Sequence, residues 1–438
     1  MDSAKVKVLV FPNGERYPML FDEEGMPDYW VTLYVTESLR VSVAASTIEN
    51  VIQNIRHLKL WEESEGRDLM SEFSKGKFLD DYDINSLRDH CQLNAKSLRK
   101  RLRDKKVKNV TALELLYPTA KKNIPSVSRS HFANRLVDIA SYLKFTARTM
   151  LRRRKGFADM CKAIDAMKDR IIAQKSKIST PKGNVGDPDS KAPAASVFDA
   201  LMKVVKEDSY DNPFKNTGVR NRNALVFNIM YETGTRAGEI LAIQVGDIDF
   251  QKGCVNIVRR PDNPDDPRAR QPTVKTLGRP IPITPELLEA LRNYIFDVRA
   301  VTKGANKHPY LFVTHKKGKH QGRPISNSTF INRILKPATA QFPDMFDEIN
   351  RHGFRHNFNY RLSKSIDAHN KEARANPDGE KEVINEAQEL HIRKDLNGWD
   401  SDTTAQTYNL RHIKETADKL MREDMNAQSK NFKKGQEV

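Results

Sequence analysis

The chain has 438 residues, with 74 Lys and Arg against 57 Asp and Glu, so its formal net charge is +17. A composition of 38% hydrophobic and 30% charged residues is typical of folded domains with a charged surface and excludes a disordered or collagen-like chain. The length predicts two or three domains. No apolar run approaches the roughly 18 residues that span a bilayer, and no secretory signal is visible, so we expect a cytoplasmic protein without membrane contact.

The cysteines, the absence of common catalytic motifs and the net charge indicate which cofactors and partners to expect. Cys91, Cys161 and Cys254 are far apart and odd in number, which predicts reduced thiols rather than a disulfide framework or a zinc site. No phosphate-binding loop, zinc-protease motif, nucleophile elbow or compact acidic motif occurs, so no cofactor is expected. The excess positive charge favours nucleic acid over an anionic membrane, because no basic amphipathic helix with an apolar face is visible.

The first part of the chain changes its hydrophobic period near residue 41. Within residues 1–40, apolar and polar residues alternate, as at 6–10 and again at 30–34, which predicts a strand-containing segment. Apolar residues then recur every three or four positions, as at 48–60, so we predict an all-helical domain over residues 41–175.

This helical domain carries two dense basic runs, at residues 96–108 and 152–155. A single basic run can be a solvated helix face, but two runs in one helical domain favour contact with a nucleic acid backbone. The residues that we predict to bind DNA are Lys96, Arg99, Lys100, Arg101, Arg103, Arg152, Arg153 and Arg154.

A segment rich in Pro, Gly, Ser and Lys follows and predicts an interdomain linker at residues 176–195. Residues 196–438 are predicted to form a second, mainly helical domain. Gly234 is expected to end one helix, Thr235 to begin the next, and Thr284 to cap a third. Short strands are predicted at 254–259, 273–275 and 281–283.

Two motifs of the second domain could bind a phosphate group. Arg236 is predicted to lie in the first turn of a helix, where its guanidinium can donate two hydrogen bonds to one phosphate and Glu239 can brace it. His352 and Arg355, in the sequence HGFR, are spaced to share one face of a helix. Each motif alone also occurs by chance on protein surfaces.

A third motif places two aromatic residues near the C-terminus. Trp399 and Tyr408 lie nine residues apart, within reach of one site across a turn and one or two helical turns. Either residue alone could equally be part of the core, so the order of all three motifs carries the interpretation.

In this order and spacing, the motifs resemble the catalytic domains of the tyrosine recombinases, or phage integrase family. The matching residues are Thr233-Gly234-Thr235-Arg236 with Glu239, then Lys275, His352, Arg355, Trp399 and Tyr408. The resemblance covers about residues 196–425, and the helical domain at 41–175 is similar to the family's core-binding domain. It implies a mainly α (α+β) fold: an N-terminal helical, SAM-like core-binding domain and a catalytic domain of helices with a small inserted antiparallel sheet.

The chain departs from the family pattern in two places. Trp399 stands where many members have His, an option that the family also uses, and an indole N–H can still donate to a phosphate oxygen. The 44 residues from Arg355 to Trp399 are more than we expect, and they include the turn signal Asn-Pro-Asp-Gly at 376–379. We therefore expect a helical hairpin insertion at residues 365–388.

The resemblance implies a mechanism. Tyr408 would attack a scissile phosphodiester and form a 3′-phosphotyrosyl bond, which keeps the bond energy, so that neither ATP nor a metal is required. Lys275 would protonate the leaving 5′ oxygen. The groups expected to bind the phosphate oxygens in the transition state are Arg236, His352, Arg355 and Trp399.

The resemblance also implies partners. The two domains would close around duplex DNA at specific recombination sites, in a nucleoid-associated protein. The helix after Tyr408 has an apolar stripe at Ile413, Ala417 and Leu420. The stripe could pack on its own domain or dock on a neighbouring subunit, as in a homotetramer, and accessory DNA-bending or directionality proteins could take part. The expected function is a site-specific recombinase or integrase of a mobile element; a type IB topoisomerase and a non-catalytic DNA-binding relative remain alternatives.

Overall fold

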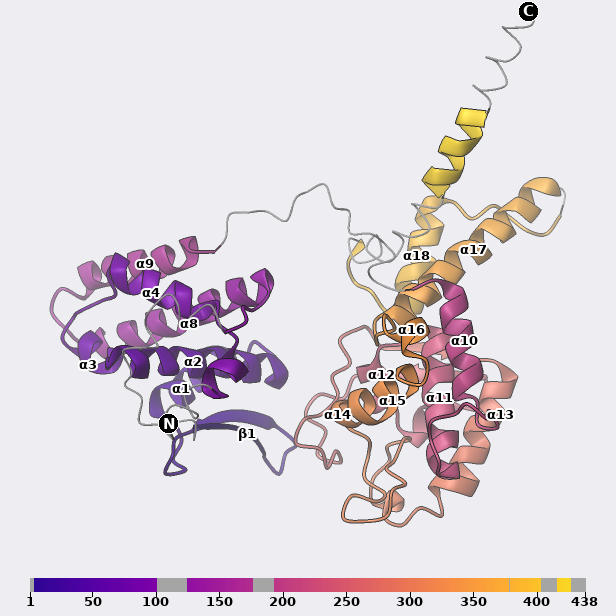
Figure 1. Ribbon diagram of the computed structural model, residues 1–438, viewed down its shortest axis with the longest axis horizontal. Coiled ribbons are helices and arrows are strands. Elements are labelled where there is room, and N and C mark those ends of the chain that lie inside the picture. Colours follow the sequence, from indigo (N-terminus) through magenta and orange to yellow (C-terminus); the bar gives the residue numbers. More distant parts are fainter. Residues whose placement is uncertain (1–3, 101–123, 176–192, 378, 403–415, 427–438) are drawn as a thin grey trace, which may run out of the picture. The chain divides into compact units, whose positions relative to one another are not determined.

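The computed structural model describes residues 4–100, 124–175, 193–377, 379–402 and 416–426. The chain forms two compact units, Met1–Lys182 and Gly183–Val438 (Figure 1). Part of the expected linker, residues 176–192, lies outside the described residues. Each unit is described by itself.

The N-terminal unit begins with a two-stranded antiparallel hairpin, β1 (Lys5–Val10) and β2 (Arg16–Phe21), in which Val8 lies opposite Pro18. Tyr17 and Leu20 of β2 are buried in the same core as the helices that follow. The second strand predicted in this segment is wrong, because residues 29–34 form a helix.

Within the described part of this unit, seven helical elements follow, besides a helix that begins at residue 95. They are α1 (Tyr29–Tyr34), η1 (Val35–Leu39), α2 (Ala45–Glu65), α3 (Leu69–Ser74), α4 (Asp81–Cys91), α8 (Arg129–Leu151) and α9 (Phe157–Ala173). The long helices follow the period predicted from the sequence: Ile52, Ile55 and Leu58 of α2 are fully buried, as are Leu136 and Leu143 of α8. The prediction of a helical domain is therefore correct for these segments.

The C-terminal unit has most of its helices around one hydrophobic core (Figure 1). Its α-helices are α10 (Ala195–Val205), α11 (Thr217–Thr233), α12 (Ala237–Ala242), α13 (Pro285–Asn293), α14 (Asn327–Thr329), α15 (Lys336–Thr339), α16 (Pro343–Phe346), α17 (Gly353–Ala375) and α18 (Glu386–Asn397). Its 3₁₀ and π segments are η3 (Val245–Asp247), η4 (Tyr294–Arg299), η5 (Ala305–Lys307) and η6 (Phe330–Leu335). This mainly helical architecture with small antiparallel sheets confirms the predicted fold class.

A small antiparallel sheet is inserted between α12 and α13. Its strands β3 (Ile248–Asp249), β4 (Cys254–Ile257) and β5 (Arg279–Pro282) lie in this order, with Val255 opposite Ile281. The strand predicted at 273–275 is wrong, since this segment is an extended loop. A Cβ at Gly238 would lie 2.7 Å from the carbonyl oxygen of Thr273, so the loop runs directly against α12.

Aromatic packing fixes the start of α17. The ring of Phe354 lies 5.1 Å from that of Phe198 in α10 and 5.8 Å from that of Phe227 in α11, measured between ring centroids. All three side chains are fully buried. This contact fixes the backbone of the next residue, Arg355, inside the unit.

The expected insertion is not a separate hairpin. Helix α17 continues unbroken to Ala375, and α18 begins at Glu386, so the extra length extends the helix that begins beside His352. The connection is held by Asn370, whose amide donates to the carbonyl of Ile384 at 2.9 Å and accepts from its N–H at 2.8 Å. Within the described residues, no helix is long and apolar enough to cross a membrane.

Candidate active site

Arg236 lies at the junction of two helices. Helix α11 ends at Gly234, which has a φ of 62°, and α12 begins at Ala237, so Arg236 rather than Thr235 is the N-cap. The backbone N–H of Arg236 donates to Glu239 Oε2 at 3.0 Å, and its Nη1 lies 3.4 Å from Glu239 Oε1. The Arg236 side chain remains 24% exposed, whereas that of Glu239 is fully buried. Glu239 therefore contacts both the backbone N–H and the accessible guanidinium of Arg236.

Glu239 also ties the following loop to α12. It accepts a hydrogen bond from Thr276 Oγ1 at 2.7 Å and lies 3.4 Å from Nη2 of the buried Arg279. Arg279 in turn donates to the carbonyl of Leu396 at 2.8 Å. Burial lowers the pKa of Arg279, while the Glu239 carboxylate opposes that shift. This anchoring fixes the backbone next to Lys275, whose side chain is exposed.

The other arginines of the same loop have different roles. Arg268 is buried, forms an ion pair with Asp266 at 2.8 Å and donates to the carbonyls of Leu241 and Ile325 at 3.0 and 2.8 Å. Arg268 thus holds the loop to the core, as Arg279 holds β5. Lys275 and Arg270 are exposed in this loop, as is Arg259 near its start.

His352 and Arg355 occupy the first turn of α17, with His352 as the N-cap. Arg355 is 1% exposed and donates to the carbonyl of Gly234 at 3.1 Å and to that of Asn397 at 2.6 Å. Partial burial, together with the charges of Arg351, Arg236 and Arg355, lowers the pKa of His352. This shift favours the neutral imidazole, which can donate a hydrogen bond from one ring nitrogen and accept one at the other.

Trp399 packs against the guanidinium of Arg355. It follows Gly398, whose φ of 63° ends α18, and its ring centroid lies 5.0 Å from the guanidinium carbon of Arg355. The indole is 4% exposed. The carbonyl of Gly398 accepts from the N–H of Leu277 at 3.1 Å, which joins the Trp399 segment to the loop that carries Lys275.

The structure thus gathers Arg236, His352, Arg355 and Trp399 from segments that are far apart in the sequence. Arg236 and His352 are accessible, whereas Arg355 and Trp399 are buried behind them. The predicted nucleophile, Tyr408, lies outside the described residues. Among the described residues, no three His, Cys, Asp or Glu side chains are grouped so that they could hold a metal ion.

The residues predicted to contact DNA belong to the N-terminal unit. Lys96 and Lys100 are exposed and Arg99 is half-buried, on a helix that begins at residue 95. Arg101 and Arg103 lie outside the described residues. The other three are exposed in the turn between α8 and α9: Arg152, Arg153 and Arg154.

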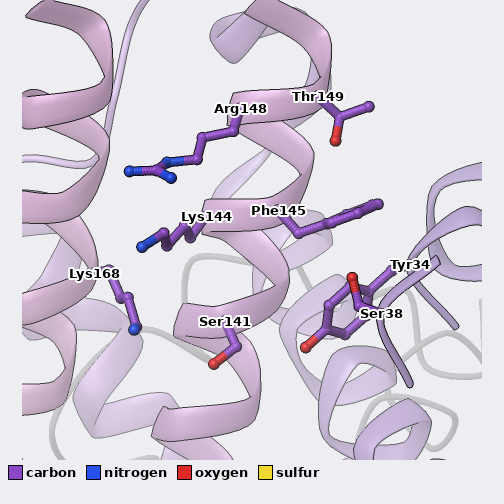
Figure 2. A pocket seen from close by; sticks show the side chains of 8 residues that line it. All are labelled: Tyr34, Ser38, Ser141, Lys144, Phe145, Arg148, Thr149 and Lys168. Carbon is purple, nitrogen blue, oxygen red and sulfur yellow. The ribbon is translucent and has the colours of Figure 1, made fainter. Parts of the chain in front are cut away.

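A pocket of the same unit gathers further cations that sequence reasoning missed. Figure 2 shows Lys144 and Arg148 extending from α8 toward α9, the helix that carries Lys168. Asp165 partly neutralises them, because it forms ion pairs with both Lys144 and Arg148. The sequence signal for this pocket was a lysine and an arginine four residues apart in α8. These cations do not form a basic run, because apolar core residues such as Leu143 lie between them and their neighbours.

The buried polar residues that hold the site together were also missed. Asn359 and Ser363 lie one and two turns after Arg355 on α17, and Asn397 and Arg393 face them from α18. Polar residues four apart on the same face as a buried arginine were the only sequence signal.

Comparison with known proteins relates part of the chain to a known family. Residues 195–369 match the model of the phage integrase family. The chain is 22% identical over 201 residues to tyrosine recombinase XerD of Halalkalibacterium halodurans, an alignment that spans 45% of this chain and 58% of that protein. Residues 195–369 thus carry a domain of the phage integrase family, the family that the motifs resemble.

Solved structures of recombinases resemble the chain as well. XerA recombinase aligns with a TM-score of 0.35 and 14% identity, over 89% of this chain and 97% of that one. XerH bound to a palindromic difH substrate gives 0.40 and 17%, over 76% and 84%. The Tn1549 transposon integrase, in complex with a circular intermediate DNA, gives 0.43 and 14%, over 86% and 93%.

Proposed function

We propose that this protein is a site-specific tyrosine recombinase that cuts and rejoins duplex DNA through a covalent 3′-phosphotyrosine on Tyr408, in the integration or excision of a mobile element. One observation carries the proposal: Arg236, His352, Arg355 and Trp399, from three distant segments, meet at the start of α17. All four side chains can donate hydrogen bonds, and a phosphate that gains negative charge in a transition state is what such a cluster would stabilise.

The exposed groups would meet the phosphate first. Arg236 can bind two of its oxygens, because Glu239 holds the backbone N–H and fixes the rotamer without covering the guanidinium. His352, whose lowered pKa favours the neutral imidazole, can donate one hydrogen bond from the same side.

Arg355 and Trp399 would act from behind these groups. A guanidinium has five N–H donors, and the carbonyls of Gly234 and Asn397 account for two of those of Arg355. Its positive charge, buried beside an indole, would act through a low dielectric and therefore strongly on a nearby phosphate.

Lys275 would complete the reaction as the general acid. The two residues that follow Lys275 hold its backbone: the Thr276 hydroxyl donates to Glu239, and the N–H of Leu277 donates to the carbonyl of Gly398. The side chain of Lys275 itself remains exposed. It would give its proton to the 5′ oxygen that leaves when Tyr408 attacks, and take it back on rejoining.

Duplex DNA is the proposed substrate for both units, with the basic residues of the N-terminal unit on the DNA backbone. The helix at 416–426 supports a contact between subunits, because Leu420, Met421 and Met425 are 61%, 66% and 58% exposed. A helix that presents an apolar face to solvent fits docking on a second copy, as in a homotetramer on two DNA sites.

The proposal is tested with a suicide DNA substrate that carries the element's candidate attachment site. We expect a covalent protein–DNA adduct from the unaltered chain, none from Tyr408→Phe, and a large loss in Arg355→Ala. An undiminished adduct in Tyr408→Phe would refute the assignment of the nucleophile. Relaxation of plasmids that lack any specific site, at low protein concentration, would instead identify a type IB topoisomerase.

A further inference from the structure

The C-terminal end of α18 is held by donors from other parts of the unit. The last carbonyls of a helix lack partners within the helix and need donors from elsewhere. Here three consecutive carbonyls, those of Leu396, Asn397 and Gly398, accept hydrogen bonds from outside α18. In this order the donors are Arg279 Nε at 2.8 Å, Arg355 Nη2 at 2.6 Å and the N–H of Leu277 at 3.1 Å. Two of these donors lie within four residues of Lys275, so the loop of Lys275 is attached to the end of α18.

Arg279 is the buried side chain that connects this loop to α18. It also donates to Thr276 Oγ1 at 3.0 Å and to the carbonyl of Leu277 at 3.2 Å, the two residues that follow Lys275. The packing around its guanidinium is close, since a Cβ at Gly398 would lie 2.5 Å from Arg279 Nη1 and 2.9 Å from the Leu277 carbonyl oxygen. A shift of the loop relative to α18 would therefore break the hydrogen bonds of Arg279.

The same guanidinium contacts the carboxylate beside Arg236. Arg279 Nη2 lies 3.4 Å from Glu239 Oε2, the oxygen that accepts from the backbone N–H of Arg236 at 3.0 Å. The other oxygen of Glu239 accepts from the hydroxyl of Thr276 at 2.7 Å. Only 4% of the Arg279 side chain and none of the Glu239 side chain is exposed. The loop, α12 and the end of α18 are thus joined through one side chain.

We propose that Arg279 is a positioning residue for the general-acid step: it holds Lys275 where its ammonium can protonate the leaving 5′ oxygen. The inference rests on the proposed function, which assigns that proton to Lys275. Arg279 does not give the proton itself, because it is buried and its N–H groups donate to oxygens of the protein. The side chain of Lys275 is exposed and flexible, so the position of its backbone decides what it reaches. A displacement of about 1 Å can cost about 100-fold in rate.

A DNA substrate with sulfur in place of the bridging 5′ oxygen separates placement of the acid from support of the fold. With oxygen, the Tyr408 oxygen bonds to phosphorus as its proton passes to water, and the P–O5′ bond breaks. Its electron pair stays on the 5′ oxygen, which takes the proton of Lys275. With sulfur, the P–S bond breaks and the thiolate leaves with the electron pair and without a proton, because a thiol is far more acidic than an alcohol. A defect confined to the general acid therefore disappears with sulfur.

The test measures the rate of adduct formation by the full chain on both substrates, each with the candidate attachment site. Arg279→Lys keeps a positive charge beside Glu239 but loses the planar set of donors. We expect this variant to slow cleavage of the oxygen substrate by about 10- to 100-fold and that of the sulfur substrate by less than about threefold. Lys275→Ala, the reference for a lost acid, should show the same selectivity, with a loss on oxygen of about 100-fold or more. Equal slowing of both substrates by Arg279→Lys would overturn the inference.

The matched control is Arg268→Lys, at the other buried arginine of this loop. Arg268 is bound to Asp266 and to the carbonyls of Leu241 and Ile325, on the core side of the loop. Any loss in this variant should slow both substrates equally. A defect that is selective for oxygen and as large as that of Arg279→Lys would show that any disturbance of the loop suffices, and would refute the role of Arg279.

A second variant decides the question if Arg279→Lys fails to fold. Thr276→Val removes the hydroxyl that joins Arg279 to Glu239, with little change in shape. It should slow cleavage of the oxygen substrate alone, by about threefold or more, and equal rates on both substrates would count against the inference. Equal slowing of both substrates in Lys275→Ala would refute the acid role of Lys275 and the inference with it. The proposed function itself fails only if the unaltered chain forms no adduct on Tyr408 with either substrate.

Discussion

The side-chain amides of Asn359 and Asn397 hydrogen-bond each other in both directions, at 3.1 and 3.0 Å, although they lie 38 residues apart. Both are buried, one on α17 and the other at the end of α18. The Asn397 carbonyl accepts from Arg355, and the Asn359 amide donates to the Arg355 carbonyl at 2.9 Å. This amide pair therefore joins the two helices at the point where Arg355 is held.

Replacing Asn397 by Ala should weaken both stability and DNA cleavage. The buried amide of Asn359 would lose both of its hydrogen bonds with Asn397, which typically costs about 1–3 kcal/mol in the free energy of unfolding. Urea unfolding measures this cost, and the suicide-substrate adduct measures the effect on Arg355. The exposed Asn306→Ala should change the free energy of unfolding by no more than about 0.5 kcal/mol. Similar losses in the two variants would show that the amide pair has no special role.

Glu239→Gln should destabilise the C-terminal unit by about 3 kcal/mol, because Arg279 would remain buried without its carboxylate. Adduct formation should fall further than stability explains, since Arg236 loses its brace. The matched control is Glu289→Gln, which breaks an exposed pair with Arg292 at 3.7 Å and should have almost no effect on unfolding. A stable Glu239→Gln protein with full cleavage activity would contradict the role assigned to Glu239.

Gly234→Ala should be far more harmful than Gly246→Ala. At Gly234 the φ is 62° and a Cβ would lie 2.6 Å from the ring of Phe358, whereas at Gly246 nothing lies within 4 Å of the added atom. The left-handed conformation alone costs alanine about 1–2 kcal/mol, and the clash adds to it. Thermal unfolding compares the two variants. We also expect lower adduct yield in Gly234→Ala, because the displaced carbonyl is one that Arg355 contacts.

The C-terminal unit should lose stability in mild acid through His315. Burial lowers the pKa of His315 to about 4, and its two ring nitrogens lie 3.1 Å from the Tyr294 hydroxyl and 3.0 Å from the Thr302 hydroxyl. The unfolded chain, with a His pKa of about 6.5, binds the proton first as the pH falls. The free energy of unfolding should therefore decrease from pH about 6.5 to about 4, by about 3 kcal/mol from this residue. His315→Gln should flatten this part of the profile in urea unfolding followed by circular dichroism; an unchanged profile would argue against it.

Elements with local signals were predicted well from the sequence. Gly234 ends α11, and Thr284 caps α13 by accepting from the N–H of Leu287 at 3.3 Å, as its sequence indicates. The strand expected at residues 30–34 failed because Asp28 accepts from the N–H of Val31 at 2.9 Å and starts a helix there. Alternation of apolar and polar residues over only five positions favours a strand less strongly than a capping aspartate favours the start of a helix.

For the site, the sequence identified the residues with chemistry but not those that hold them. Arg236, His352 and Arg355 are recognisable because their motifs are local. The pairing of Asn359 with Asn397 depends on two helices meeting, which no local pattern encodes.

Helix α17 is long enough to place its exposed C-terminal end far from the phosphate-binding residues at its start. Twenty residues lie between Arg355 and the end of the helix at Ala375, which corresponds to about 30 Å along its axis. The exposed connection to α18 beyond it, including Glu380, is thus remote from the phosphate-binding groups. A fluorophore or affinity tag placed in this connection would report on assembly of the protein on DNA while leaving the strand-exchange chemistry undisturbed.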